Sequence, residues 1–434
     1  MASFFIPLTG LESDSTALNT IANDLANMNT TAFKAETTNF SDLFYQQIGS
    51  TGAGDPIQVG AGVQVASNEL NFSQGSINSS GNATDVALNG NGFFVISNGS
   101  GGYELTRDGN FTQAANGNLL ANGMSVMGYP AANGVVNTTA PLTAVNIPVG
   151  AVQESKATTT MSMTANLDSA TAVNATYPAE VTVYDSLGEA HVATVTYTAL
   201  GDNQWGYSVG LPASDYSTTG VNVVPGAITG TLTFDQNGNL TEVQPTGGAA
   251  SNVGTAAGDA QSVDLNFNPA ATNVLADGAA GLDIQWNLLG SSGAPNISQV
   301  DTTSAVSATA QDGYASGQYQ SFAIGSDGTV TITYSNGQKQ NVGQLALGNV
   351  TNLQGLQLMG DGNYITTRAS GPISFGTSGT SGLGTVQDDA LEASNVNIST
   401  EFSDLIIAQR AFEANAKSVT TFDTVTQDTI NMVH

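Results

Sequence analysis

The sequence predicts a mainly β protein that carries an α-helix at each end of the chain. The first and last segments place apolar residues at the heptad spacing of a helix. Between them, apolar and polar residues alternate in short runs that end at Asn-Gly or Gly turns, which is typical of antiparallel strands. The expected architecture is a set of nested, discontinuous β domains, sandwich-like or barrel-like, on a coiled coil of the N- and C-terminal helices.

Residues 1–30 form the predicted N-terminal helix. Their apolar side chains recur at alternating steps of three and four residues, which places them on one narrow stripe. This pattern predicts an amphipathic helix with a seam for contact with another helix. The N-terminal seam residues are Leu8, Leu11, Leu18, Ala22 and Leu25.

Residues 386–434 contain the second, longer predicted helix. Asn397 is the expected N-cap, because its short polar side chain can accept hydrogen bonds from the first turn. A helix from there to residue 433 would be about 55 Å long at 1.5 Å per residue. Glu413 and Lys417 have the spacing of a favourable ion pair. The C-terminal seam residues are Ile398, Phe402, Leu405, Phe412, Ala416, Val419, Ile430 and Val433.

Two interpretations of these seams stay open. In the first, the terminal helices pair within one molecule. In the second, they also meet copies of the same chain, because a long seam interrupted by Ser15, Gln409 and Asp423 would be marginally stable as an isolated hairpin. The seam residues of both helices are therefore candidate polymerisation residues.

The middle of the chain is predicted to be all β. Strands on either side of Gly188 form one hairpin, and the pairs Asn237-Gly238 and Asn336-Gly337 mark the turns of two more. We expect an extended connector over 31–75, an inner β domain formed by 76–156 and 301–385, and an inserted outer β domain over 157–300. The insert lies in a stretch of 182 residues, 157–338, that has no Lys or Arg. The Gly-rich stretch 371–384 is expected to be a flexible hinge.

Charge and composition exclude several classes of protein. The formal net charge is −28, with 7 Lys and Arg against 35 Asp and Glu. Because nucleic acids and anionic membranes are bound mainly through clustered cations, we expect neither as a partner. No apolar run approaches the length of a membrane helix, so no membrane insertion is expected. The absence of cysteine excludes disulfides and thiolate sites. The start of the chain lacks the positive region of a cleaved signal, so any export would use another route.

We find no convincing catalytic or metal-binding pattern and expect no cofactor, no metal and no enzyme. Ser208 stands in a G-x-S-x-G sequence, but the residues around it alternate as a strand and no helix follows. Asp235 to Asn239 resembles the start of a calcium loop without its later ligands, so it is interpreted as a hairpin turn. His191 is expected on the surface or opposite a neighbouring strand.

Two terminal motifs resemble the signatures of the bacterial flagellar rod and hook proteins. The first is ANDLANMNTTAFKAETTNFSDLFYQQ, residues 22–47, and the second is ALEASNVNISTEFSDLIIAQRAFEANAKSV, residues 390–419. The chain departs from the first signature at Ala32, where the family has Gly, and at Asp24, where it has Asn. The residues that carry the resemblance are Asn27, Phe33, Lys34, Glu392, Asn395, Gln409, Arg410 and Asn415.

The resemblance implies a structural subunit of a helical, tubular homopolymer. Its expected partners are copies of itself, the flagellar rod, cap and junction proteins, and the flagellar type III export apparatus. Its expected location is the basal body and hook of the flagellum. The large insert favours a hook member, which acts as a universal joint in motility. A distal rod or hook-associated protein is the nearest alternative. From other classes we keep a secreted serine hydrolase that uses Ser208, and a β-rich adhesin.

Overall fold

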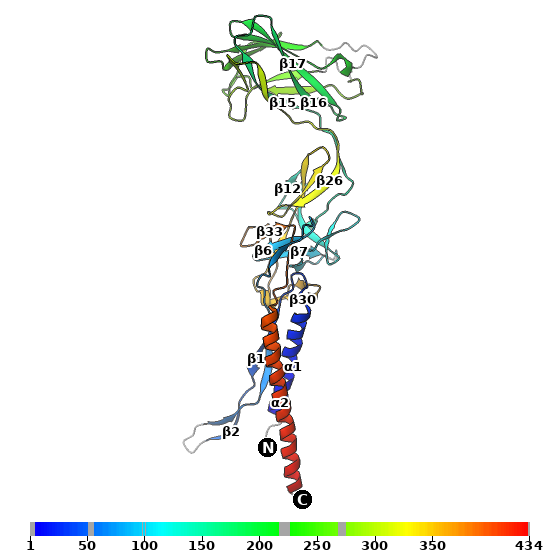
Figure 1. Cartoon of the computed structure of the whole chain (residues 1–434), viewed down its shortest axis with the longest axis vertical. Coiled ribbons are helices and arrows are strands. Elements are labelled where there is room, and N and C mark those ends of the chain that lie inside the picture. Colours follow the sequence, from blue (N-terminus) through cyan, green and yellow to red (C-terminus); the bar gives the residue numbers. More distant parts are fainter. Residues whose placement is uncertain are drawn as a thin grey trace. The chain divides into compact units, whose positions relative to one another are not determined.

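The computed structural model describes residues 5–50, 56–97, 99, 101–216, 226–267 and 275–432. It confirms a mainly β chain with a helix near each end (Figure 1). The chain divides into two compact units, which are Met1–Val149 with Gln320–Thr333 and Lys339–His434, and Gly150–Tyr319 with Tyr334–Gln338. The second unit contains the predicted insert of 157–300 and extends beyond it at both ends, because the strand over 305–311 pairs inside this unit.

Helix α1 (Phe5–Ala26) and helix α2 (Ile398–Met432) of the first unit pack side by side in antiparallel directions (Figure 1). Asn397 is the N-cap of α2, as predicted. Its Oδ1 accepts hydrogen bonds from the backbone N–H groups of Ser399 and Thr400. The predicted Glu413–Lys417 pair is replaced by a contact between Glu413 and Arg410, one turn earlier in the same helix.

The segment predicted to be an extended connector over 31–75 is extended but paired with itself. Strand β1 (Glu36–Asp42) is antiparallel to β4 (Val63–Leu70), and β2 (Gln46–Ser50) is antiparallel to β3 (Pro56–Val59) farther along the same hairpin (Figure 1). Thr9 of α1 accepts a hydrogen bond from the backbone of Val63, which ties the hairpin to the helix. The segment is therefore a structural element and not a plain linker.

The inner β domain of the first unit surrounds a core that includes Phe93, Leu105, Tyr129 and Tyr364. Strand β32 pairs with β29 and Leu383 is buried, so the predicted hinge at 371–384 is instead folded into this domain. Its elements are β5 (Ile77–Ser79), β6 (Val86–Asn89), β7 (Phe93–Ser97), β8 (Glu104–Thr106), β9 (Thr112–Gln113), β10 (Leu119–Ala121), β11 (Met124–Ala132), β12 (Val135–Val136), β13 (Thr143–Ala144), β26 (Gly317–Ile324, which starts in the second unit), β27 (Thr329–Tyr334), β28 (Lys339–Leu345), β29 (Leu347–Asn349), a 3₁₀ turn (Leu353–Gly355), β30 (Gln357–Gly360), β31 (Asn363–Ile365), β32 (Ser374–Gly376), β33 (Thr385–Asp388) and β34 (Ala390–Glu392).

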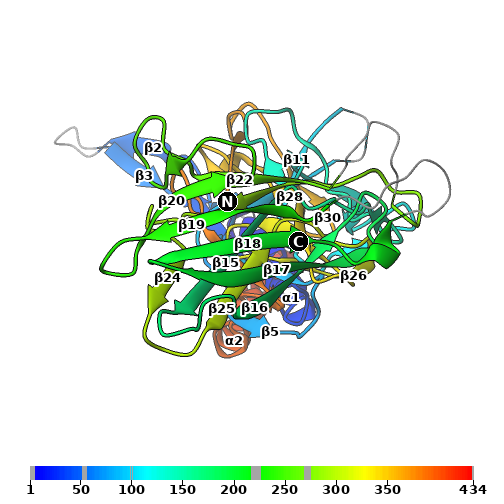
Figure 2. The ribbon, with the colours of Figure 1, turned by 90° about the horizontal axis from the view of Figure 1, so that it is seen from above.

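The second unit is a β-sandwich. One sheet has the strand order β16-β17-β18-β19-β20-β21, of which β17 to β20 are seen side by side in Figure 2, and the other contains β22, β23, β15, β24 and β25. The rings of Tyr207 and Trp286, one from each sheet, meet edge to face in the shared core. Its elements are β14 (Val152–Gln153), β15 (Thr160–Asp168), β16 (Thr176–Tyr184), β17 (Ala190–Gly201), β18 (Gln204–Gly210), a 3₁₀ turn (Ala213–Asp215), β19 (Ile228–Phe234), β20 (Leu240–Pro245), β21 (Ser251–Asn252), β22 (Ser262–Asn266), β23 (Asp283–Asn287), β24 (Ile297–Val300) and β25 (Ala305–Gln311).

All three predicted hairpins are present, and the motifs near them take structural roles. Ser208 lies inside strand β18 between β17 and β19, without the strand–turn–helix geometry of a nucleophile. Oδ1 of Asp235 accepts hydrogen bonds of 2.8 Å from the N–H groups of Asn237 and Asn239, which closes the turn between β19 and β20.

His191 lies opposite Val183 of the neighbouring strand, as one of the two predicted alternatives had it, but it is buried and not on the surface. Its Nδ1 lies 2.9 Å from Oδ2 of Asp215 and its Nε2 lies 3.2 Å from Oδ2 of Asp185. Burial lowers the pKa of His191, but the hydrogen bonds with Asp215 and Asp185 outweigh burial and raise it above its ordinary value. Strand alternation explains the burial, since His191 shares the inward face of β17 with Ala193 while Val192 faces outward.

Candidate functional site: the paired terminal helices and the ion cluster beside them

The contact between α1 and α2 is made by small and polar residues. Gly10 lies against Asn415, and a Cβ atom at Gly10 would be 2.6 Å from Nδ2 of Asn415. This Nδ2 donates a hydrogen bond of 2.8 Å to Oδ2 of Asp14. A glycine is therefore needed where the amide crosses between the helices. The buried residues of α1 are Pro7, Gly10, Ser13, Ala17, Thr20 and Asp24.

The predicted seam residues lie beside this buried row and not in it. Leu8 is 43% exposed and Phe402 is 52% exposed. Ala22, Ile398, Phe412 and Ile430 are also exposed, Leu11, Leu18, Leu25, Leu405, Ala416 and Val419 are half-buried, and Val433 lies outside the described residues. Heptad spacing selects the largest apolar side chains, whereas two helices in close contact bury the smallest ones.

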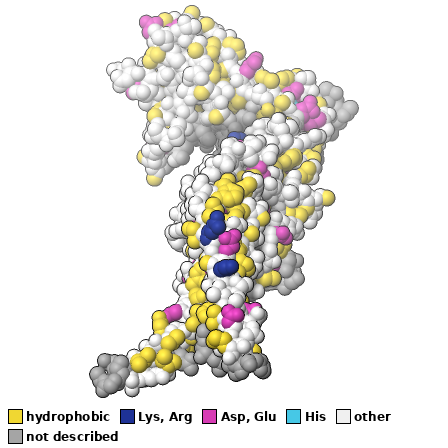
Figure 3. Space-filling model, turned by 60° about the horizontal axis from the view of Figure 1, so that its bottom comes forward, with side chains coloured by type: hydrophobic (Ala, Val, Ile, Leu, Met, Phe, Trp, Pro, Cys, Tyr) yellow, Lys and Arg dark blue, Asp and Glu magenta, His cyan; other side chains and the backbone are white. Residues whose placement is uncertain are grey.

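Both helices consequently present a large apolar surface. Phe5 on α1 and Ile406 and Ile407 on α2 are more than half exposed, in addition to the exposed seam residues. Figure 3 shows hydrophobic side chains gathered along the helical part of the molecule, with a few charged ones among them. Because soluble monomers rarely expose contiguous apolar patches of this kind, the surface is a candidate site for protein–protein contact.

A buried ion cluster joins the start of the hairpin, the inner β domain and the segment before α2. Nζ of Lys34 lies 2.6 Å from Oε1 of Glu392, and Nη1 of Arg107 lies 3.4 Å from Oε2 of the same carboxylate. Burial lowers the pKa of Lys34 and of Arg107, and Glu392 opposes this change in both. Neighbouring carbonyls complete the cluster, since Lys34 donates to Ser73 O and Arg107 donates to Gly90 O. The cluster fixes three distant segments at one point.

Asn395 forms a second link between the same segments. Its Nδ2 donates to the carbonyl oxygens of Asn71 and Ser73 at 2.7 and 3.0 Å, and its Oδ1 accepts the N–H of Ala35 at 2.8 Å. The N–H of Asn395 also donates to the carbonyl of Phe33. The Asn395 side chain therefore provides hydrogen-bond partners for backbone groups on both sides of the hairpin formed by β1 and β4. We call the place where the segment before α2 meets the start and end of this hairpin the chain crossing.

Ala32, which stands where the family signature has glycine, takes a backbone conformation that favours glycine. Ala32 has φ of +55° and is 4% exposed, and its N–H donates to the carbonyl of Glu392 at 2.8 Å. The left-handed conformation that a glycine would take without strain is therefore kept by an alanine, at a steric cost.

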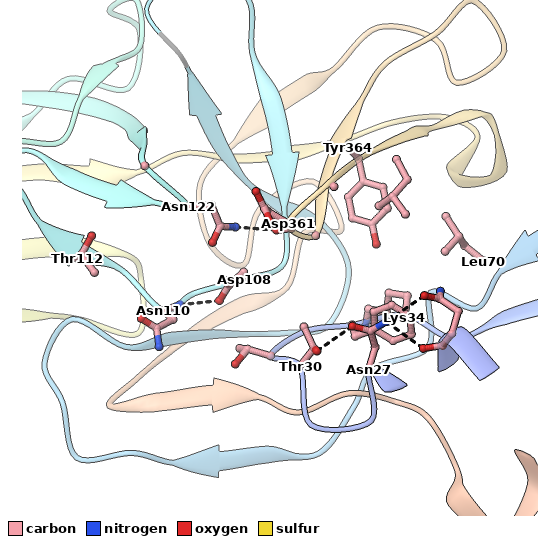
Figure 4. Close-up of a pocket in the computed structure, with 17 residues that line it drawn as sticks. Asn27, Thr30, Lys34, Leu70, Asp108, Asn110, Thr112, Asn122, Asp361 and Tyr364 are labelled. Atoms are coloured by element: carbon pink, nitrogen blue, oxygen red, sulfur yellow. Dashed lines mark hydrogen bonds between the residues drawn. The ribbon is translucent and has the colours of Figure 1, made fainter. Parts of the chain in front are cut away.

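Asn27 follows the last residue of α1 and lines a pocket of about 650 Å³ in the first unit (Figure 4). Its Nδ2 donates to the carbonyl of Asn23, and its Oδ1 accepts the hydroxyl of Thr30. Phe33 and Lys34 also line this pocket. The pocket contains no group of three His, Asp or Glu side chains able to hold a metal among the described residues, and its polar residues bond to each other.

Gln409 and Arg410, the remaining motif residues, are exposed on α2. The structure thus brings Lys34 and Asn395 together at the chain crossing and Asn415 to the helix pair, and leaves Gln409 and Arg410 on the surface. Sequence reasoning missed Arg107 as the partner of Glu392. A signal was present, because Lys34 and Arg107 are two of only seven cations in the chain and Lys34 stands in a motif segment.

Three family models match the chain. "Flagellar hook protein FlgE/F/G D1 domain" matches residues 87–162, "Flagellar basal body protein FlaE D2 domain" matches residues 151–314, and "Flagellar basal body rod FlgEFG protein C-terminal" matches residues 387–432. Neither helix among the described residues is long and apolar enough to cross a membrane.

Curated relatives match over the full length. Proteins named flagellar hook protein FlgE are 32% identical in Treponema pallidum (100% of this chain, 99% of that protein) and 34% identical in Salmonella typhimurium (99% and 100%). The Escherichia coli protein of that name is 33% identical, over 99% of this chain and all of its own. The crystal structure of the Helicobacter pylori flagellar hook protein FlgE2 shares the fold, with a TM-score of 0.54 at 14% identity over 73% of this chain and all of that one. The chain belongs to the family of flagellar hook proteins.

Proposed function

We propose that this chain assembles with copies of itself into the tubular hook of a bacterial flagellum. The observation that carries the proposal is the exposed apolar surface of α1 and α2, which includes Leu8, Phe402 and Phe412. Each fully buried large apolar side chain contributes about 1.5–3 kcal/mol, so burying several of them in each subunit contact favours association. The seam residues are therefore the proposed polymerisation residues.

The hairpin after α1 supports the same proposal. Phe44, Tyr45 and Ile48 are exposed near its β2–β3 part, and Phe44 is 95% exposed. An isolated two-stranded hairpin is marginally stable in water, and apolar side chains at its end favour contact with another surface. We propose that this hairpin packs on a neighbouring copy.

In the assembled hook, the polymer carries torque from the rod to the filament while it bends. Bending requires firm inner contacts and outer contacts that slide. The second unit suits the outer role, since its only Lys or Arg is Lys156, which is already paired with Asp312. Because this unit has a single cation, opposite charges cannot fix the register between neighbouring second units, which can therefore slide. Substitutions that give this unit apolar contact surfaces should stiffen the hook, and unchanged bending would contradict this role.

The partners proposed beyond the chain itself follow from its place in the organelle. They are the rod on one side, the cap and the hook–filament junction proteins on the other, and the flagellar type III apparatus that exports the subunit. The second unit, which a distal rod protein would be expected to lack, favours the hook over the rod alternative.

Electron microscopy of the purified full-length chain tests the proposal. Under salting-out conditions the full chain should form curved hollow tubes, and a chain without residues 1–30 and 398–434 should stay monomeric. Tubes from both chains would contradict the role of the helices. Monomers from both would contradict self-assembly. Binding to a surface without tubes would support the adhesin alternative.

A further inference from the structure

A groove of about 320 Å³ in the first unit lies between α1, β1 and α2. Its floor is apolar and includes Ala17, Ile21 and Ala408. The charged residues that line it are Asp14, Glu36, Glu401 and Asp404, and we call this groove the acidic groove. Among the described residues none of these carboxylates has a Lys or Arg within ion-pair distance.

A buried carboxyl group next to the groove, that of Asp24, interacts unfavourably with the groove carboxylates, so a cation bound in the groove would be stabilising. Asp24 is fully buried, its Oδ2 accepts the N–H of Glu36, and its Oδ1 has no hydrogen-bond partner among the described residues. Burial raises the pKa of Asp24 to about 6, and the charges of Glu401 and Glu36 add to the increase. Burial and the neighbouring Asp404 also raise the pKa of Glu401. These carboxylates therefore repel each other in the isolated chain.

The complementary charges lie on the same helix but on its other side. Arg410 and Lys417 are the only cations within α1 and α2, and both are exposed. At 3.6 residues per turn they stand about 200° and 180° around α2 from Ala408, which is buried towards the groove. The contact of Arg410 with Glu413 is fully on the surface, with side chains 79% and 67% exposed, and such pairs contribute little.

We propose that the acidic groove of one copy receives the Arg410–Lys417 face of α2 from a second copy. This inference rests on the proposed self-assembly and names the surfaces that meet. Ile406 stands about 160° around α2 from Ala408, beside the two cations on the same face, and is 58% exposed, so it can meet the apolar floor of the groove. Because the two surfaces face opposite sides of α2, each copy can use both at once. Such a head-to-tail contact repeats along a helical polymer instead of closing a dimer.

Charge reversal tests the inference in full-length chains. Glu401→Lys with Asp404→Lys, or Arg410→Glu with Lys417→Glu, should each lower the yield of sedimenting tubes at least tenfold. All four substitutions in one chain, or an equimolar mixture of the two double variants, should restore tubes, because opposite charges then meet again. Glu69→Lys with Asp388→Lys has the same charge change as the groove variant on exposed positions of the first unit outside the seam and the groove, and should leave the yield unchanged. If wild type forms tubes and neither reversal affects them, the inference is wrong and the proposed function stands.

Cysteine cross-linking gives a readout that does not require tubes. The natural chain has no cysteine, and positions 404 and 410 are about 9 Å apart along α2 on different sides, too far for a disulfide within one helix. A chain with Asp404→Cys and Arg410→Cys should give a ladder of disulfide-linked oligomers on oxidation, while each single variant stops at dimers. A ladder without tubes would support this contact and contradict hook assembly. Tubes without a ladder would contradict this contact alone.

Discussion

Asn415 of α2 donates a hydrogen bond of 2.8 Å to Asp14 of α1, across the interface between the two terminal helices. These residues are 401 positions apart in the chain. The amide of Asn415 fits between the helices because Gly10 has no side chain. The family-motif residue Asn415 thus links the two terminal helices.

A double-mutant cycle between Gly10 and Asn415 should show strong coupling. Gly10→Ala introduces a Cβ that displaces the amide, whereas in an Asn415→Ala background the same methyl group has space. We expect Gly10→Ala to be more favourable by about 1–2 kcal/mol in that background, measured by urea unfolding followed by helical circular dichroism. Alanine also favours the helix over glycine, but this gain is the same in both backgrounds and therefore cancels in the cycle. Asn19→Ala, at an exposed position of α1, should be additive with Asn415→Ala. Additivity at Gly10 would show that the amide does not occupy this space.

Removing the charge of Glu392 should destabilise the first unit strongly. Glu392→Gln leaves Lys34 and Arg107 buried without their common carboxylate, which costs about 3–5 kcal/mol for a buried pair. Arg410→Gln breaks only an exposed pair and should change the free energy of unfolding of the monomer by less than about 1 kcal/mol. Chemical denaturation of both variants measures the difference. Equal effects would mean that the cluster does not link the three segments.

Residue 32 should tolerate glycine and reject branched side chains. Ala32→Gly relieves the left-handed strain at φ of +55°, and we expect stability equal to wild type or up to about 1 kcal/mol higher. Ala32→Val places a β-branched side chain in the same conformation and should cost about 2 kcal/mol or more. Thermal unfolding distinguishes the two. A valine variant as stable as the glycine variant would contradict the conformation of this residue.

Asp24 should make the helix pair less stable as the pH rises. Its pKa is about 6 in the folded chain against an ordinary value of 3.8, so the folded state binds the proton more tightly. This contribution is complete below about pH 4 and is lost as the pH rises to about 6. Asp24→Asn should therefore gain stability over wild type between pH 4 and pH 7 in urea unfolding. Asp42→Asn, an exposed carboxylate of β1, serves as the control. A constant difference between Asp24→Asn and wild type across this range would refute the prediction.

The sequence by itself determined the class of the fold and the family. Heptad spacing located both helices, and the short polar side chain of Asn397 predicted the N-cap, since both depend on residues within one or two turns. Asn-Gly turns located two hairpins, because a turn needs only a few adjacent residues. The terminal motifs identified the family through Lys34, Asn395 and Asn415.

Only the tertiary structure decided which faces meet and what the motif residues contact. Periodicity placed Leu8 and Phe402 on the predicted seams, whereas the contact between α1 and α2 includes Gly10 and Asn415 and leaves these larger side chains exposed. The position of Glu392 between Lys34 and Arg107 depends on segments hundreds of residues apart, and so does the burial of Asp24. The residue pattern within a segment indicates the secondary structure that the segment prefers. Burial and ion pairing instead depend on the side chains that distant segments bring to the same place.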